Sequence, residues 1–323
     1  MNIQSQIRTV CGDILPETLG YCQCHEHIFL RAGTTPALSP AICFEDLSRS
    51  AQELQLYKCC GGNAIVDAQP IGCGRDARAL LALSAQTKVH IIASTGFHRL
   101  AFYAPTHWIF KLDTERLASL FEHEITQGMF ESCDNAPPSS LPLCCRAGQI
   151  KTALEPEGIT GQRRTLLLAA AQASVRTGAP LMVHVERGSD PVALLNFWEA
   201  TGVSPQKMIF CHMDRMVDSL AIHQELCRKG AYLEYDTIGR LKYHTDEREA
   251  EIIEQIASSG YLSQLLLSLD TTRARLKSYG GDIGICYLIE SFSPFLKARG
   301  FSEQSLQQLQ QQNPATVYAF ACN

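Results

Sequence analysis

The sequence predicts a closed (β/α)8 barrel, in which eight parallel strands alternate with helices around one core. Three observations support this fold class. Short apolar runs of strand type recur eight times along the chain. Longer amphipathic stretches separate many of them, as βα units require. The runs are apolar almost throughout, which is typical of parallel strands buried on both faces. An open doubly wound sheet is the alternative that the same alternation allows.

The predicted elements follow in order along the chain. Strands are expected at residues 21–30, 63–68, 90–95, 149–153, 180–185, 207–211, 231–236 and 264–270, and the clearest helices at 164–176, 219–229 and 248–258. Gly178 and Gly230 follow two of these helices, at the position that favours glycine. Residues 131–148 are rich in Pro, Ser and Asn and indicate a long irregular loop. We find no internal repeat or boundary, so we expect residues 1–323 to form a single barrel domain.

Composition excludes several classes of protein. Apolar residues make up 46% of the chain and charged residues 19%, which is enough for a buried core and argues against disorder. The net charge of -5 comes without a basic stripe, so we expect no nucleic-acid partner. No signal peptide or membrane-length apolar run is apparent, which predicts a cytoplasmic location. The 14 cysteines include no Cys-x-x-Cys and are expected to be reduced, most of them as small buried side chains.

A pair of histidines ends the first predicted strand. His25 and His27 flank Glu26, and alternate residues of a strand point the same way, so both imidazoles can reach one metal ion. Glu26 is then expected to point outward. The motif is short, and two ordinary polar residues at a strand end would give the same pattern.

Three more candidate ligands stand at or near the ends of other predicted strands. His184 and His212 come at the ends of two apolar strands, and Asp270 ends the last one. Barrel enzymes carry their chemistry at the carboxyl ends of the strands. Any one of these residues could be a core residue with satisfied polar groups, but their recurrence at equivalent positions favours a common site.

The ordered set of candidates resembles a known family. From about residue 10 to its end, the chain resembles the phosphotriesterase-related branch of the amidohydrolase superfamily. Three phrases are of the family type: LEPEGIT (154–160), CHMDR (211–215) and NPA (313–315). The residues that match the family's metal ligands, in order, are His25, His27, Lys151, His184, His212 and Asp270. The resemblance implies a metal-dependent hydrolase with two divalent ions. His25, His27 and Asp270 would bind one ion, and His184 and His212 the other.

Lys151 takes its role only from this resemblance. A lone lysine is more often a solvated surface group, and an ammonium cannot bind a cation. In the family, carbon dioxide converts a lysine at this position into a carbamate whose oxygens bridge two metals, and burial would supply the neutral amine for that reaction. Glu155 and Glu157 are rival carboxylates. Nitrogen and oxygen ligands suit Zn²⁺, which we expect first, or Mn²⁺ and Co²⁺.

The expected reaction is hydrolysis by a hydroxide that bridges the two ions. It would attack a lactone or other ester-like bond, and Asp270 would take up the proton and pass it to the leaving group. A phosphotriesterase is the alternative, because the same nucleophile attacks phosphorus. A mononuclear deaminase would not need Lys151. A non-catalytic metal-binding protein is the alternative from another class, although a structural zinc site is normally closed by four Cys or His ligands.

Residues beyond the strands suggest the substrate. Lys242 and Arg273 follow the last two predicted strands and could together hold an anionic group; His98 follows the third and could line the pocket. All three could equally be solvated loop residues. A comparable Lys and Arg pair occurs in relatives that open phosphorylated sugar lactones, whereas Thr237 stands where relatives that hydrolyse acyl-homoserine lactones tend to carry Arg. We expect a small-molecule substrate, no membrane partner, and a homodimer as barrels of this kind often form.

Overall fold

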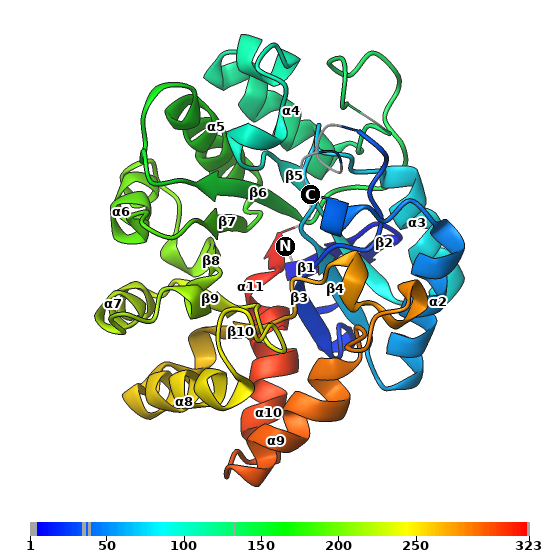
Figure 1. Ribbon diagram of the computed structural model, residues 1–323. Helices are drawn as coiled ribbons and strands as arrows, with labels where there is room; N and C mark the ends of the chain where they lie inside the picture. Colours follow the sequence, from blue (N-terminus) through cyan, green and yellow to red (C-terminus); the bar gives the residue numbers. More distant parts are fainter. Residues whose placement is uncertain (1–4, 34–36, 38–39, 132, 322–323) are drawn as a thin grey trace.

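Eight parallel strands form the centre of the molecule in the computed structural model, which describes residues 5–33, 37, 40–131 and 133–321. They follow one another in chain order around a nearly closed barrel, with helices on the outside (Figure 1). The (β/α)8 fold is therefore confirmed, with every predicted strand present. The strands are β3 (Cys22–Glu26), β4 (Ala64–Asp67), β5 (His90–Gly96), β6 (Gln149–Leu154), β7 (Leu181–Val185), β8 (Met208–Cys211), β9 (Tyr232–Tyr235) and β10 (Leu265–Leu267).

The outer layer is made of helices that alternate with these strands. They are α2 (Leu47–Cys59), α3 (Ala77–Thr87), α4 (Thr114–Thr126), α5 (Gly161–Thr177), α6 (Pro191–Ala200), α7 (Ala221–Lys229) and α8 (Asp246–Ile256), followed by α9 (Ser293–Ala298), α10 (Glu303–Gln307) and α11 (Asn313–Val317). Aspartate side chains accept backbone N–H groups at several helix starts, as Asp46 does for α2. Gly178 and Gly230 end α5 and α7 with positive φ, as the sequence predicts.

The barrel closes between its first and last strands. The backbone N–H of Asp270 donates to the carbonyl of His25 at 3.1 Å. The Ser268 hydroxyl accepts the N–H of His25 and donates to its carbonyl, both at 2.8 Å. The seam of the barrel therefore brings two of the predicted metal ligands, one near each end of the chain, next to each other.

A second, smaller sheet covers the end of the barrel at which the eight parallel strands begin. The sequence did not indicate this sheet. It pairs β1 (Ser5–Thr9) with β2 (Gly12–Ile14) and with β11 (Ala319–Ala321), all antiparallel. Ile7, Leu19, Val317 and Tyr318 pack from this end against the apolar side chains inside the barrel. We call this end the floor. In Figure 1, β1 is seen near the centre of the ring, close to the marked N-terminus.

Two further observations concern the rest of the chain. The described part of 131–148 contains no helix or strand; its backbone joins the body through bonds such as that from the Trp108 indole to the carbonyl of Cys133 at 2.6 Å. Among the described helices, none combines the length and apolar character needed to cross a bilayer.

Candidate active site at the mouth of the barrel

A polar pocket of about 220 Å³ opens at the carboxyl ends of the strands, which we call the mouth. Five of the six predicted metal ligands line it, and the sixth, Lys151, is fully buried beside them. The described lining comprises His25, His27, Ala41, Ile42, His98, Phe102, His184, His212, Arg215, Arg240, Lys242, Asp270 and Thr272. The structure thus brings together side chains from five strand ends that are far apart in the sequence.

The first ligand group lies at the barrel seam. Ligand atoms of His25, His27 and Asp270 are all within 4.8 Å of one another, and His27 Nε2 is 3.5 Å from Asp270 Oδ1. β3 ends at Glu26 rather than at residue 30, and a register shift interrupts its pairing with β4. His27 therefore stands just beyond the strand, and the irregular backbone allows both imidazoles to face the pocket.

The second group comes from neighbouring strands. His184 Nδ1 and His212 Nε2 are only 2.7 Å apart, so both nitrogens point at the same place. The far nitrogen of each ring has its own acidic partner: His184 Nε2 is 3.3 Å from Glu186, and His212 Nδ1 is 2.6 Å from Asp236. These contacts orient the rings and leave the facing nitrogens available to a metal ion.

Lys151 lies on β6 between the two groups. Its Nζ is 3.3 Å from His25 Nε2 and 3.3 Å from the Met182 sulfur. Within the described chain, no carboxylate lies within ion-pair distance of this fully buried amine. Lysine side chains are almost never fully buried without a partner, so the position of Lys151 beside the predicted ligands indicates a role in the site.

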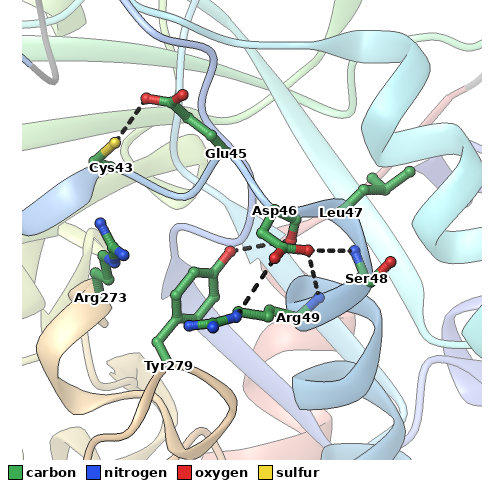
Figure 2. Close-up of a pocket in the computed structure, with 8 residues that line it drawn as sticks. All are labelled: Cys43, Glu45, Asp46, Leu47, Ser48, Arg49, Arg273 and Tyr279. Carbon is green, nitrogen blue, oxygen red and sulfur yellow. Dashed lines mark hydrogen bonds and ion pairs between the residues drawn. The ribbon is translucent and has the colours of Figure 1, made fainter.

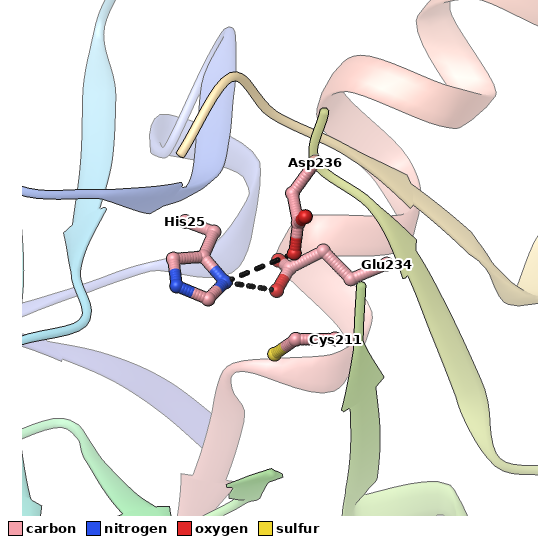
Figure 3. A group of neighbouring side chains, drawn as sticks. All are labelled: His25, Cys211, Glu234 and Asp236. Atoms are coloured by element: carbon pink, nitrogen blue, oxygen red, sulfur yellow. Dashed lines mark hydrogen bonds and ion pairs between the residues drawn. The ribbon is translucent and has the colours of Figure 1, made fainter. Parts of the chain in front are cut away.

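Two buried carboxylates, Glu234 on β9 and Asp236 just after it, lie beside the His25 ring (Figure 3). Glu234 lies 2.9 Å from His25 Nδ1, and Asp236 lies 3.2 Å from the same nitrogen as well as close to His212. Both carboxylates are fully buried, and burial raises their pKa values. As acceptors for Nδ1–H, they favour the tautomer that presents Nε2 to the pocket.

Glu26, which the sequence predicts to point outward from the metal face, is buried in the structure. Its side chain is fully buried and turns away from the metal ligands toward the end of β10. It accepts the backbone N–H groups of Leu269 and Thr271, each at 3.0 Å. Because these residues flank Asp270, Glu26 holds the turn that presents this carboxylate to the pocket.

Asp270 is held by cations as well as by its neighbours on the backbone. Arg215 and Arg240 each donate to its Oδ2 at 2.9 Å. Burial raises its pKa, but Arg240 and His27 outweigh that effect and hold the pKa of Asp270 well below its usual range. Asp270 and His212 both have positive φ, 44° and 61°. For residues other than glycine this backbone is strained, which is common at functional sites.

The donor set suits divalent metal ions. Burial lowers the pKa values of His25 and His184 to about 4 and that of His212 well below its usual value. The imidazoles are therefore neutral at pH 7, the form that binds metals. Neutral nitrogens, an ionised carboxylate and a buried lysine converge on one pocket, so the residues present fit the binuclear centre that the sequence suggests.

The predicted substrate residues separate into two places. His98 and Lys242 line the pocket with the ligands, and the His98 ring lies 5.3 Å from that of His184. Arg273 lines a neighbouring open hollow with Tyr279 and Arg49, shown in Figure 2. The expected pairing of Lys242 with Arg273 around one group is not present in this structure.

Sequence reasoning assigned no role to several residues that shape the site. Arg215 and Arg240 bind Asp270, and Glu234 and Asp236 orient histidines. One signal could have identified the last two. They alternate in the otherwise apolar strand Tyr-Leu-Glu-Tyr-Asp, so both point to the same side as the predicted ligands of the neighbouring strands.

Comparison with known proteins agrees with this geometry. Two phospho-furanose lactonases, from Mycoplasmopsis agalactiae and Mycoplasmopsis synoviae, are 29% and 30% identical to the chain, over 97% of it and 91% of each relative. The crystal structure of an amidohydrolase from Mycoplasma synoviae superposes with a TM-score of 0.93 at 29% identity, covering 98% of this chain and 92% of that one. The model of the phosphotriesterase family matches residues 5–318. The chain therefore belongs to the phosphotriesterase family and is a hydrolase that acts on ester bonds.

Proposed function

We propose that this hydrolase opens a phosphorylated sugar lactone, using two divalent metal ions held at the mouth of the barrel. The observation that carries the substrate class is the charge of the pocket. Among its described lining residues, Arg215, Arg240 and Lys242 are cationic, whereas Asp270 is the one carboxylate. An anionic substrate would complement this excess of positive charge.

The relatives support the same substrate class. Two of them, similar over nearly the whole chain, are phospho-furanose lactonases. Lys242 is exposed at the rim, and its Nζ lies 4.6 Å above the Tyr243 ring rather than in an ion pair. It is therefore free to contact a phosphate as a point charge. Arg240 is buried nearer the ligands and would contact the lactone end.

The metal centre would use all six predicted ligands. His25, His27 and Asp270 would hold one ion, His184 and His212 the other, and carbamylated Lys151 both, with Zn²⁺ as the first choice for these donors. Such ions supply an acidified water and a Lewis acid for the carbonyl. Glu234 and Asp236 keep the histidines in the tautomers that binding requires.

Asp270 would handle the proton. It is the pocket carboxylate, it is ionised, and its Oδ1 faces His27 while Oδ2 is bound by two arginines. A carboxylate so placed can accept a proton from the attacking water and release it to the departing alkoxide of the opened ring. Arg215 and Arg240 limit its movement and keep it ionised before the reaction.

Metal analysis tests the centre. Protein purified without chelator should contain two equivalents of divalent metal, and Lys151→Ala should lose most of it and all measurable turnover. Lys242→Ala is the matched control, because this lysine lines the same pocket outside the ligand set; its metal content should stay at two equivalents. Unchanged metal in Lys151→Ala would remove Lys151 from the centre.

Parallel kinetics test the substrate. A sugar lactone phosphate, the same lactone without phosphate, and a chromogenic phosphotriester would be compared with one enzyme preparation. We expect kcat/KM to be highest for the phosphorylated lactone. Lys242→Met should raise KM for that substrate alone, whereas Arg273→Met should do so only if the phosphate extends into the neighbouring hollow. Preference for the phosphotriester would contradict the proposal.

A further inference from the structure

Two cysteines that the proposed reaction does not use lie close together on the outside of the barrel. Cys60 directly follows α2, and Cys286 belongs to the segment between β10 and the π-helical turn η11 (Leu288–Phe292). Their sulfur atoms and a carboxylate oxygen of Glu290 are all within 4.8 Å of one another. The two thiols thus come from opposite ends of the sequence to one place.

Their surroundings allow the two sulfurs to meet. Cys60 is partly exposed, and Cys286 is only 4% exposed. Gly61, with φ of 103°, and Gly62 follow Cys60 and end the helix in a turn, in which their N–H groups donate to the carbonyls of Lys58 and Tyr57. A disulfide needs sulfurs about 2 Å apart. The two sulfurs would therefore have to approach each other by at most about 3 Å.

We propose that Cys60 and Cys286 form a reversible disulfide when the protein meets an oxidising small-molecule disulfide such as oxidised glutathione. The Cys60 thiolate attacks one sulfur of the small disulfide and expels one small thiolate. The Cys286 thiolate then attacks the Cys60 sulfur of the mixed disulfide and expels the second. Two protein thiols are oxidised, one small disulfide is reduced, and the two protons end on the released thiols.

The exposure of the two thiols decides which one reacts first, and their pKa values affect the rate. Cys60 is the more accessible of the two, so the reagent reaches it first. Burial raises the pKa of both thiols, which keeps the thiolate fraction small at neutral pH. We therefore expect the exchange to become faster as the pH rises.

The crosslink would strengthen an existing contact between α2 and the segment at residues 273–286. Glu53 of α2 accepts the backbone N–H groups of Ser278 and Ile285, at 2.7 and 2.9 Å. The Tyr279 hydroxyl donates to the carbonyl of Asp46 at 3.0 Å, and Arg273 and Arg49 both pack over the Tyr279 ring (Figure 2). A Cys60–Cys286 bond would join the other end of α2 to the same segment and stabilise the wall that carries Arg273.

Peptide mapping of the oxidised, metal-loaded protein tests this proposal. After incubation with oxidised glutathione and alkylation of the remaining thiols, non-reducing digestion should yield a peptide linking Cys60 to Cys286. The Tm should rise by a few degrees and return on reduction, with metal content unchanged. Cys59→Ser is the matched control, because this exposed neighbour should be dispensable, whereas Cys60→Ser and Cys286→Ala should both lack the linked peptide and the Tm shift.

Other results would overturn the assignment. The proposal would be wrong if mapping found a bond between Cys59 and Cys60. It would also be wrong if wild type gave no linked peptide under conditions that oxidise Cys60. Protection of both thiols by Zn²⁺ alone, reversed by a chelator, would make the cluster a metal site. As a control on folding, the reduced Cys60→Ser variant should match reduced wild type in Tm and turnover, so that loss of the linked peptide cannot come from misfolding.

Discussion

At the mouth of the barrel, fully buried side chains include histidines, acids and a lysine, and two non-glycine residues adopt positive φ. At the floor, Ile7, Leu19, Val317 and Tyr318 pack against the apolar interior under a short antiparallel sheet. The strands that connect the two ends are the same. One end concentrates charge that is costly to bury, and the other supplies apolar burial that stabilises the fold.

This difference shows how a barrel carries a reactive site without losing stability. Substitutions at the mouth should change metal binding or turnover more than folding. Substitutions at the floor should change the free energy of unfolding and leave turnover per folded molecule unaltered. Five substitutions can test that separation, beginning with the largest expected effect.

Replacing Asp270 by Asn should lower kcat by about 10²–10⁴-fold, because the amide cannot accept the proton. Much of the metal should remain, since five other ligands are intact. Turnover measured beside elemental analysis would check both statements. Activity equal to wild type in the metal-loaded variant would remove the proton-transfer role from Asp270.

Replacing Glu234 by Ala should weaken metal binding by about 10–100-fold, because His25 would lose the nearer of the two acceptors that orient its ring. Glu234→Gln is the matched control, since its amide oxygen can still accept the Nδ1–H and should restore most of the affinity. Competition with a chelator measures the difference. Equal loss in both variants would mean that the charge of Glu234, rather than its hydrogen bond, matters.

At the floor, Ile7→Ala should lower the free energy of unfolding by about 2–5 kcal/mol, as expected when a fully buried isoleucine is truncated. Chemical denaturation gives this value. The metal content and kcat of the folded protein should match wild type. A parallel loss of metal would show that the two ends are coupled, which would break the comparison.

Asn313→Ala should cost about 1–3 kcal/mol, because the Asn313 amide donates to the carbonyls of Leu262 and Leu265 at 2.8 and 2.7 Å. This residue begins the NPA phrase, which thus fastens α11 to the start of β10. Thermal unfolding would show the loss. A selective fall in kcat without a change in Tm would instead give the phrase a catalytic role.

The smallest effect should come from Lys207, whose amine donates to the carbonyls of Val317 and Ala319 at the floor. Burial lowers its pKa to about 8. The unfolded chain then binds more protons than the native state between pH 8 and about 10.4, so stability from this group rises with pH across that window. Lys207→Met should flatten this part of the stability profile; an unchanged slope would assign it to other groups.

The repeating pattern of strands and helices could be predicted from the sequence because each βα unit repeats the same local requirement. An apolar strand of three to seven residues is followed by an amphipathic helix, as at β7 and α6. The candidate ligands could be identified because parallel strands place their carboxyl ends at one edge. The floor sheet was missed because its strands have three to five residues and pair the two ends of the chain.

By itself, the sequence determined the barrel, the family resemblance and the six side chains that converge at the mouth, since these depend on period and order along the chain. Only the tertiary structure decided that Glu26 clamps the Asp270 turn, that Glu234 and Asp236 orient the histidines, and that Arg273 lies apart from Lys242. These contacts join segments distant in the sequence, and their partners depend on loop paths and burial that no local pattern encodes.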